Sequence, residues 1–360
     1  MFEPGRESSV SFAALLDIAR SIFFMAIRVA INGFGRIGRN VLKASLEKKL
    51  TLDFVAVNDL TDTKTLAHLL KYDTSYGRYD KKVEYDNANI IVDGKKIRVL
   101  AEKDPSKLPW KELKIDVVIE STGRFTDKDG MSLHLQAGAK RVILSAPAKG
   151  GGVPTYVLGV NDKDMTDEAL INNASCTTNC ISPVAEVMHA KFGVAKAVMT
   201  TVHGYTQDQN LQDAPHKDLR RARAAAANIV PTTTGAAIAT TEAIPELKGL
   251  FDGLAIRVPV PVVSLSDLTF LLKKKVTVEE VNNAFRDAAR NPAMKGILDV
   301  TDEPLVSSDF IRNSHSSIVD LSLTKVIDGD LVKVIAWYDN EWGYSSRLAE
   351  MVERVGKTLQ

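Results

Sequence analysis

The feature that most constrains the fold is a glycine-rich turn that follows a short apolar segment near residue 30. Residues 27–32 have the continuous apolar character of a buried strand, and the pattern Gly33-x-Gly35-x-x-Gly38 then opens a helix-like run to residue 46. Gly33 permits a tight turn, Gly35 lets the backbone approach a pyrophosphate, and Gly38 lets helix and strand pack closely. This order of elements predicts a dinucleotide-binding unit with the pyrophosphate at the helix N-terminus.

An acidic residue in the expected place supports that prediction. A second apolar segment, residues 53–57, ends in Asn58-Asp59. A carboxylate about 20 residues after the glycines accepts hydrogen bonds from the adenosine ribose and would repel a 2′-phosphate. Asp59 therefore favours NAD over NADP. The alternative, a glycine-rich turn with a purely structural role, is weakened because strand, helix, second strand and acidic residue occur in order.

The alternation of strand-like and helix-like segments continues to about residue 150. Apolar segments at residues 115–119 and 141–144 each end in polar residues. Ligands bind at the carboxyl ends of strands in doubly wound sheets. Lys103, Thr122 and Ser145 are therefore candidate cofactor contacts, although each can equally be a turn or cap residue.

The second half of the chain has longer strand-like segments, at residues 268–272, 317–326 and 331–338. The Asp328-Gly329 turn between the last two predicts antiparallel pairing. A helix-like run over residues 346–357 ends the chain. The sequence therefore predicts an α/β Rossmann dinucleotide-binding domain and an α+β catalytic domain with a mainly antiparallel sheet.

Composition excludes several classes of protein. With 46 Lys and Arg against 45 Asp and Glu, the net charge of +1 provides no basic field for nucleic acid or a membrane surface. The two cysteines lie four residues apart, which fits a reducing compartment better than a disulfide framework. No further Cys or His ligands accompany them, so no metal site is expected. We expect a cytoplasmic protein with neither a nucleic-acid nor a membrane partner.

Residues 1–25 do not match the rest of the chain. Their apolar part is interrupted by Asp17 and Arg20, so it is too short and too charged to span a bilayer. It also lacks the basic start and the cleavage site of a signal peptide. We expect Met25, which directly precedes the first predicted strand, to be the physiological start, with residues 1–25 a disordered or mis-assigned extension. Whether the native protein contains residues 1–24 stays open.

The strongest catalytic candidate is Cys176, in the sequence SCTTNC of residues 175–180. Small polar residues before an apolar helical run predict a helix N-terminus. The positive end of a helix dipole and its free N–H groups stabilise the thiolate, which is the nucleophilic form. The alternative is a buried structural cysteine.

Further candidates follow along the chain. His203 ends an apolar segment, and it can be structural or can act as a base for a nearby cysteine. Residues 231–235 offer hydroxyl and N–H groups before a helix, which suits an anion. Arg257 interrupts an apolar strand, and a phosphate would satisfy its charge. The short basic run at residues 216–223 indicates a solvated face or a subunit contact.

Together these motifs resemble the phosphorylating glyceraldehyde-3-phosphate dehydrogenase family, bacterial type. The matching stretches are residues 31–39, 174–180, 216–226, 231–236 and 337–344, and the likeness spans residues 26–360. The resemblance implies that Cys176 attacks the aldehyde carbon of glyceraldehyde 3-phosphate and that His203 takes the proton as hydride passes to NAD. Inorganic phosphate then attacks the thioester and releases 1,3-bisphosphoglycerate.

The resemblance also implies site residues and organisation. It assigns NAD contacts to Arg36, Ile37, Asp59, Lys103, Ser145 and Asn340, which join Gly33, Gly35, Gly38 and Thr122 from the patterns above. It assigns the attacking phosphate to Ser175, Thr177, Thr234 and Gly235, and the substrate's own phosphate to Thr206, Arg257 and Arg223. It further implies a homotetramer, with an NAD-binding domain of residues 26–175 plus 341–360 and a catalytic domain of residues 176–340.

Some alternatives stay open. NAD-specific relatives tend to carry Leu-Pro where this chain has Ala214-Pro215, and NADP-using relatives tend towards Ala-Ser, so the degree of NADP use is not fixed. The nearest rival activity is that of erythrose-4-phosphate dehydrogenase. A rival of another class is a binding protein that senses the cofactor or contacts RNA, against which Cys176 and His203 argue. The direction of flux and any secondary binding role are also open.

Overall fold

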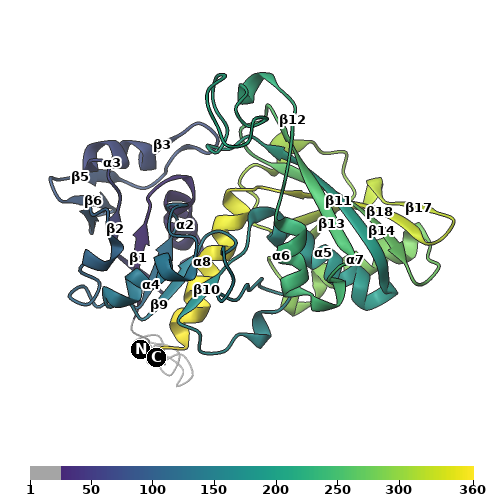
Figure 1. Ribbon diagram of the computed structural model, residues 1–360, viewed down its shortest axis with the longest axis horizontal. Helices are drawn as coiled ribbons and strands as arrows, with labels where there is room; N and C mark the ends of the chain where they lie inside the picture. The colour runs from purple at the N-terminus through teal and green to yellow at the C-terminus, as the bar shows by residue number, and fades with distance from the viewer. Residues whose placement is uncertain (1–25) are drawn as a thin grey trace, which may run out of the picture.

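The computed structural model describes residues 26–360, so the expectations for residues 1–25 lie outside the described part of the chain. Two large sheets form the centres of two lobes, and helix α8 (Trp342–Lys357) lies between them (Figure 1). The two-sheet architecture confirms the predicted fold class. No helix among the described residues combines the length and apolar character needed to cross a membrane.

The first sheet has the topology of a dinucleotide-binding fold. Its strand order is β10-β9-β8-β1-β2-β7-β6-β5, and the pairs from β10 to β7 are parallel. The order reverses beside β1, which creates a crevice at the carboxyl ends of β1 and β8. The strands are β1 (Ile27–Asn32), β2 (Leu52–Asn58), β5 (Val83–Tyr85), β6 (Asn89–Val92), β7 (Lys95–Leu100), β8 (Val117–Glu120), β9 (Arg141–Leu144) and β10 (Leu170–Asn172).

Three helices and a small ribbon complete this lobe. α2 (Arg36–Glu47) follows the glycine turn directly, and its buried side packs against α8. The other elements are α3 (Thr63–Lys71), α4 (Lys128–Gln136) and the ribbon β3 (Tyr72–Asp73) with β4 (Gly77–Arg78). Because α8 contacts both α2 and β1, we propose that the C-terminal helix belongs to the first lobe, as the sequence predicts.

The second sheet is mainly antiparallel, as predicted. Its order is β12-β13-β11-β14-β18-β16-β15, with β17 on the edge of β18. Within this sheet, the only parallel pairs among the described strands are β11–β13 and β15–β16. α5, α6 and α7 lie together on one face (Figure 1). The elements are β11 (Val194–Gly204), β12 (Val230–Thr232), β13 (Phe251–Val258), β14 (Ser264–Leu272), β15 (Leu298–Thr301), β16 (Ser317–Asp320), β17 (Lys325–Ile327), β18 (Leu331–Tyr338), α5 (Cys176–Phe192), α6 (Ala236–Ala243) and α7 (Val278–Arg290).

Three predicted segments of the second half differ from the structure, and the first is β14, which begins at Ser264 rather than at residue 268. The segment at residues 317–326 is not one strand, because a 3-10 turn over Leu321–Leu323 separates β16 from β17. The last helix begins at Trp342 rather than at residue 346. The Asp339 carboxylate explains this earlier start, since it accepts hydrogen bonds from the backbone N–H groups of Glu341 and Trp342.

The glycine turn is closely packed. Gly33 has φ +91°, and a Cβ there would lie 2.7 Å from the backbone nitrogen of Thr122. A Cβ on Gly38 would lie 2.4 Å from the carbonyl oxygen of Gly33, whereas one on Gly35 would meet no protein atom within 4 Å. Gly38 therefore sets the packing of helix on turn, and Gly35 faces open space.

We predict that Gly38→Ala lowers the free energy of unfolding by about 1–3 kcal/mol, because the turn must move to admit the methyl group. Gly35→Ala is the matched control, and it should change stability by less than about 0.5 kcal/mol. Urea unfolding of the two variants measures the difference. Equal stabilities would show that the close contact at Gly38 does not constrain the turn.

Candidate active site

A cleft of about 930 Å³ lies between the two lobes, at the carboxyl ends of the first sheet. One wall comes from the glycine turn and the ends of β2 and β8, and the other from the start of α5 and the end of β11. The cleft brings together most of the cofactor residues expected from the sequence, namely Gly33, Gly35, Arg36, Ile37, Asp59, Lys103, Thr122, Ser145 and Asn340. Gly38 lies behind this wall and acts through packing.

Asp59 is fixed at the rim of the nucleotide half. Its carboxylate accepts hydrogen bonds from the backbone N–H of Phe34 at 2.9 Å and from that of Thr61 at 3.1 Å. Each carboxylate oxygen retains a lone pair that can accept from a ribose hydroxyl. The same bonds tie the end of β2 to the glycine turn, so one residue both shapes the turn and faces the ligand space.

Arg36 anchors the start of the C-terminal segment to the first lobe at the mouth of the cleft. Its guanidinium lies 2.6 Å from Asp73, and its Nε donates to both carboxylate oxygens of Glu341 at 2.9 and 3.0 Å. Glu341 follows Asn340, whose side-chain oxygen accepts from the Ser264 hydroxyl at 3.0 Å. The amide nitrogen of Asn340 is therefore left to face the cleft as a donor.

A buried polar network that the sequence did not reveal underlies the nucleotide half. The Glu120 carboxylate accepts from Asn32 at 2.6 Å and from the backbone N–H of Thr122 at 2.8 Å, and it lies 3.1 Å from Nε2 of His134. The Trp110 indole donates to Nδ1 of His134 at 3.0 Å, so the His134 proton lies on Nε2 and points at Glu120. These bonds lock the ends of β1 and β8 at the cleft floor.

Cys176 and His203 meet at the other wall. Cys176 is the first residue of α5, and the Ser175 hydroxyl caps the helix by accepting from the N–H of Thr178 at 3.0 Å. His203 lies near the end of β11. The Cys176 Sγ is 3.4 Å from Nε2 of His203, so the two residues form the pair that the sequence could only suggest.

The environment of His203 fixes its tautomer. Its Nδ1 lies 2.6 Å from the carbonyl oxygen of Gly204, which can only accept a hydrogen bond. Nη1 of Arg257 also lies 3.2 Å from Nδ1, but it can donate to the same carbonyl oxygen at 3.3 Å. The shorter contact with the carbonyl assigns the proton to Nδ1, and the Nε2 lone pair then faces the thiol. This arrangement suits a proton transfer from sulfur to the ring.

Burial changes the acidity of both partners. Burial, and secondly the charge of Arg257, lowers the pKa of His203 to about 3. Burial also raises the pKa of the Cys176 thiol, against the lowering effects of Arg257 and Thr177. Burial of the thiol thus opposes the stabilisation that the helix N-terminus is expected to give the thiolate. The 3.4 Å contact places the two ionisable groups close enough for a direct proton transfer.

Arg257 provides a cation for an anionic ligand. Its Nη1 lies 3.3 Å from the Thr206 hydroxyl and 3.3 Å from the Gly204 carbonyl oxygen. Its Nε is buried without a hydrogen-bond partner, and no carboxylate of residues 26–360 forms an ion pair with it. Arg257 and Thr206, both expected to bind the substrate's phosphate, thus lie together on the cleft wall.

Apart from Ser175, the other residues expected to bind phosphate do not line the cleft. Ser175 lines the cleft, but the buried Thr177 hydroxyl lies 2.9 Å from the hydroxyl of Tyr338. Arg223 donates to Asp213 at 2.8 Å on an exposed loop. Thr234 and Gly235 precede α6 and do not line the cleft. The roles of Thr177, Arg223, Thr234 and Gly235 stay predictions.

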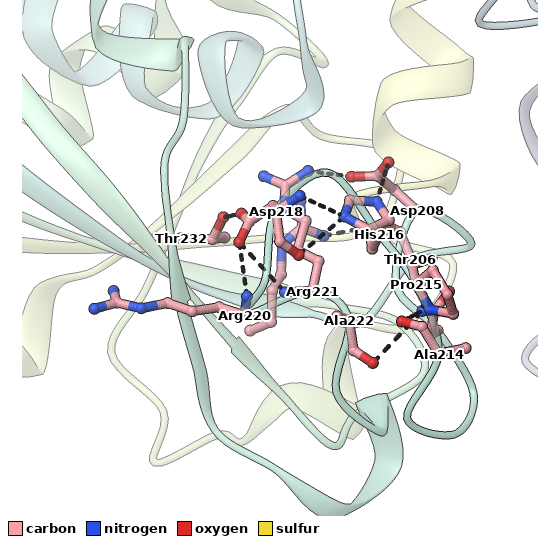
Figure 2. Close-up of polar contacts among 12 residues, drawn as sticks. Thr206, Asp208, Ala214, Pro215, His216, Asp218, Arg220, Arg221, Ala222 and Thr232 are labelled. Atoms are coloured by element: carbon pink, nitrogen blue, oxygen red, sulfur yellow. Dashed lines mark hydrogen bonds and ion pairs between the residues drawn. The ribbon is translucent and has the colours of Figure 1, made fainter.

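The segment at residues 206–232 holds Arg221 in a network of polar contacts (Figure 2). Arg221 pairs with Asp208, lies 3.4 Å from Asp218, and donates to Thr232 at 3.0 Å. Its charge reaches His203 and contributes to the lowered pKa of that residue. The resemblance assigns Arg223 to the substrate's phosphate, and this role stays a prediction, because the basic run alone does not show which arginine faces inward.

Comparison with known proteins covers both lobes. Residues 27–128 match the model of the glyceraldehyde 3-phosphate dehydrogenase NAD binding domain, and residues 175–340 match that of the C-terminal domain. Glyceraldehyde-3-phosphate dehydrogenase of Borreliella burgdorferi is 55% identical over 338 residues, which cover 92% of this chain and 100% of the relative.

Two further relatives are equally similar. The enzyme of Geobacillus stearothermophilus is 55% identical over 329 residues, 91% of this chain and 97% of the relative. Chloroplastic GAPA1 of Arabidopsis thaliana is 55% identical over 332 residues, 91% of this chain and 83% of the relative. The chain therefore belongs to the glyceraldehyde-3-phosphate dehydrogenase family.

Proposed function

We propose that the protein oxidises D-glyceraldehyde 3-phosphate with NAD and inorganic phosphate to 1,3-bisphosphoglycerate through a thioester on Cys176. The observation that carries this proposal is the 3.4 Å contact between the Cys176 sulfur and Nε2 of His203, at the wall of a cleft that also contains the dinucleotide motif. A nucleophile paired with a base beside a nucleotide site suits oxidation of an aldehyde.

The nucleotide half fits NAD. Gly35 leaves open space beside the N-terminus of α2, where a pyrophosphate can approach the backbone. Asp59 has free lone pairs for a ribose diol, and Asn340 presents an amide donor on the opposite wall. When bound there, NAD supplies the hydride acceptor for the oxidation.

The catalytic half supplies the remaining chemistry. His203 takes the thiol proton at Nε2 as the sulfur bonds to the aldehyde carbon, and it passes this proton to the aldehyde oxygen to give the hemithioacetal hydroxyl. The freed Nε2 then takes the hydroxyl proton back when hydride leaves that carbon. Arg257 and Thr206 hold the phosphate ester of the substrate, which orients the aldehyde at Cys176. An oxygen of inorganic phosphate then bonds to the thioester carbon, and the sulfur leaves as thiolate.

The oligomeric state and the cellular location are two further parts of the proposal. We propose a homotetramer, because the outer face of the second sheet exposes apolar side chains that a partner subunit would cover. Examples are Val198 on β11 and Leu254 on β13, which are 60% and 45% exposed. We propose a cytoplasmic location, since both cysteines are free thiols and suit a reducing compartment.

The direct test is NADH formation from glyceraldehyde 3-phosphate with and without inorganic phosphate. Continuous turnover should require phosphate, and without it NADH should stop near one equivalent per active site. Equal steady rates in both conditions would contradict the thioester mechanism. A higher kcat/KM with erythrose 4-phosphate, assayed side by side, would favour the rival activity.

We predict that Cys176→Ser lowers kcat by at least about 10³-fold while NAD binding is unchanged, because a serine hydroxyl is a far weaker nucleophile than a thiol beside imidazole. Stopped-flow NADH formation and calorimetric NAD titration measure the two effects. Cys180→Ser is the matched control, since Cys180 is buried beyond the cleft. Retained oxidation in Cys176→Ser would rule out the covalent route.

His203→Asn should lower kcat by about 10²–10⁴-fold. It should also move the midpoint of Cys176 alkylation by iodoacetamide to higher pH. Burial already raises the pKa of the thiol, and the thiolate fraction grows as pH rises through that pKa. Without the imidazole no adjacent base accepts the thiol proton, so the thiolate forms only at higher pH. His68→Asn, on α3 away from the cleft, is the control. An unchanged alkylation profile in His203→Asn would show that the imidazole does not activate the sulfur.

The wild-type protein should have a higher kcat/KM with NAD than with NADP, and Asp59→Ala should narrow this gap about 10- to 100-fold. The variant loses both the acceptor for the ribose and the charge that repels a 2′-phosphate. Asp59→Asn can keep an oxygen for the Phe34 N–H but turns the acceptor of the Thr61 N–H into a donor, so it removes the charge together with one acceptor. Equal use of both cofactors by the wild type would refute the role of Asp59.

A further inference from the structure

Three buried hydroxyl groups form a continuous chain behind the Cys176 sulfur. The Tyr338 hydroxyl lies 2.9 Å from Oγ1 of Thr177 and 2.8 Å from Oγ1 of Thr201. The Thr201 hydroxyl lies 3.4 Å from the carbonyl oxygen of Leu265. All three side chains belong to residues that are at most 4% exposed, so water does not compete for these bonds.

The chain connects the two elements that carry the catalytic pair. Thr177 follows Cys176 in the first turn of α5. Thr201 lies two residues before His203 on β11, so both side chains project from the same face of that strand. The ring of Tyr338 meets the His203 imidazole edge-on, with centroids 6.0 Å apart. Tyr338, on β18, thus contacts both sides of the pair from a third element.

The hydroxyl protons can take two complete arrangements, because each hydroxyl can donate once and also accept. Beside a neutral thiol, Thr201 donates to Leu265, Tyr338 to Thr201, and Thr177 to Tyr338. Beside a charged sulfur, Thr177 donates to the sulfur, in line with the side-chain hydrogen bond by which Thr177 lowers the pKa of Cys176. Tyr338 then donates to Thr177, and Thr201 to Tyr338. No proton changes its owner, and the reversal gives up only the longest bond, that of 3.4 Å.

We propose that Tyr338 is a positioning residue that stabilises the charged sulfur of Cys176 through the hydroxyls of Thr177 and Thr201. The charge develops twice, before attack on the aldehyde and when phosphate displaces the sulfur from the thioester. This inference rests on the proposed role of Cys176 as the nucleophile.

Other titratable groups around the sulfur leave room for this role. The groups that face it are His203 on β11, Arg257 on β13, Tyr338 on β18, Tyr344 on α8 and Cys180 one turn along α5. Burial raises the pKa of Cys180 to about 12 and raises the pKa of Tyr338 and Tyr344, so these three keep their protons. Tyr338 therefore donates throughout the working pH range.

The test is the pH profile of Cys176 alkylation by iodoacetamide, with the modified peptide identified by mass spectrometry. Tyr338→Phe keeps the ring and removes the hydroxyl. Its midpoint should rise by about 0.5–1 pH unit, and alkylation at pH 7 should slow about three- to tenfold. Thr201→Val should shift the profile in the same direction, and Thr201→Ser, which keeps the hydroxyl, should restore the wild-type profile.

Tyr156→Phe is the matched control. It removes another buried hydroxyl, one that donates to Glu168 at 2.7 Å and lies outside the cleft lining, so its profile should overlay the wild type. A Tyr338→Phe profile that overlays the wild type, or an equal shift in Tyr156→Phe, would overturn the proposal. If Tyr338→Phe does not fold, the Thr201 pair decides, because equal shifts in the Val and Ser variants also overturn it.

Alkylation requires neither NAD nor aldehyde. The proposed reaction can therefore fail its own assay while the hydroxyl chain passes this test, and the reverse result is equally distinguishable.

Discussion

The 3.4 Å contact between the Cys176 sulfur and the His203 ring is the interaction on which the proposed chemistry of the cleft depends. Burial favours the uncharged form of each partner, so neither ionises easily alone. Moving the proton across the contact creates the nucleophile without releasing a proton to solvent. The Gly204 carbonyl makes this possible, because it holds the ring in the tautomer whose free nitrogen faces the sulfur.

The two lobes divide the work and meet at several contacts, one of them an ion pair between Glu47 on α2 and Arg312. The first sheet presents a glycine turn and a carboxylate to a nucleotide, whereas the second presents the sulfur, the imidazole and an unpaired arginine. The chain returns between them after β18, where Asn340 lines the cleft and Glu341 pairs with Arg36 at the start of α2. Because these residues are adjacent, the ion pair that anchors the C-terminal segment to α2 and the cofactor amide contact share one segment of backbone.

Local signals were readable from the sequence, and tertiary contacts were not. The glycine turn, the Asp59 position and the cap before Cys176 are patterns of neighbouring residues, and the structure places all three as expected. The loop at residues 206–232 folds on itself, so its arginines could not be told apart by order alone (Figure 2). In the sequence, Glu120 and His134 look like ordinary polar residues, because only the folded structure shows that they are buried in contact with each other.

The most direct measurement is peptide mass spectrometry of the protein after mixing with NAD and glyceraldehyde 3-phosphate in the absence of inorganic phosphate. The account predicts an acyl adduct on Cys176 that accumulates with the first equivalent of NADH and disappears when phosphate is added. An adduct on another residue, or NADH formed while Cys176 stays unmodified, would contradict it.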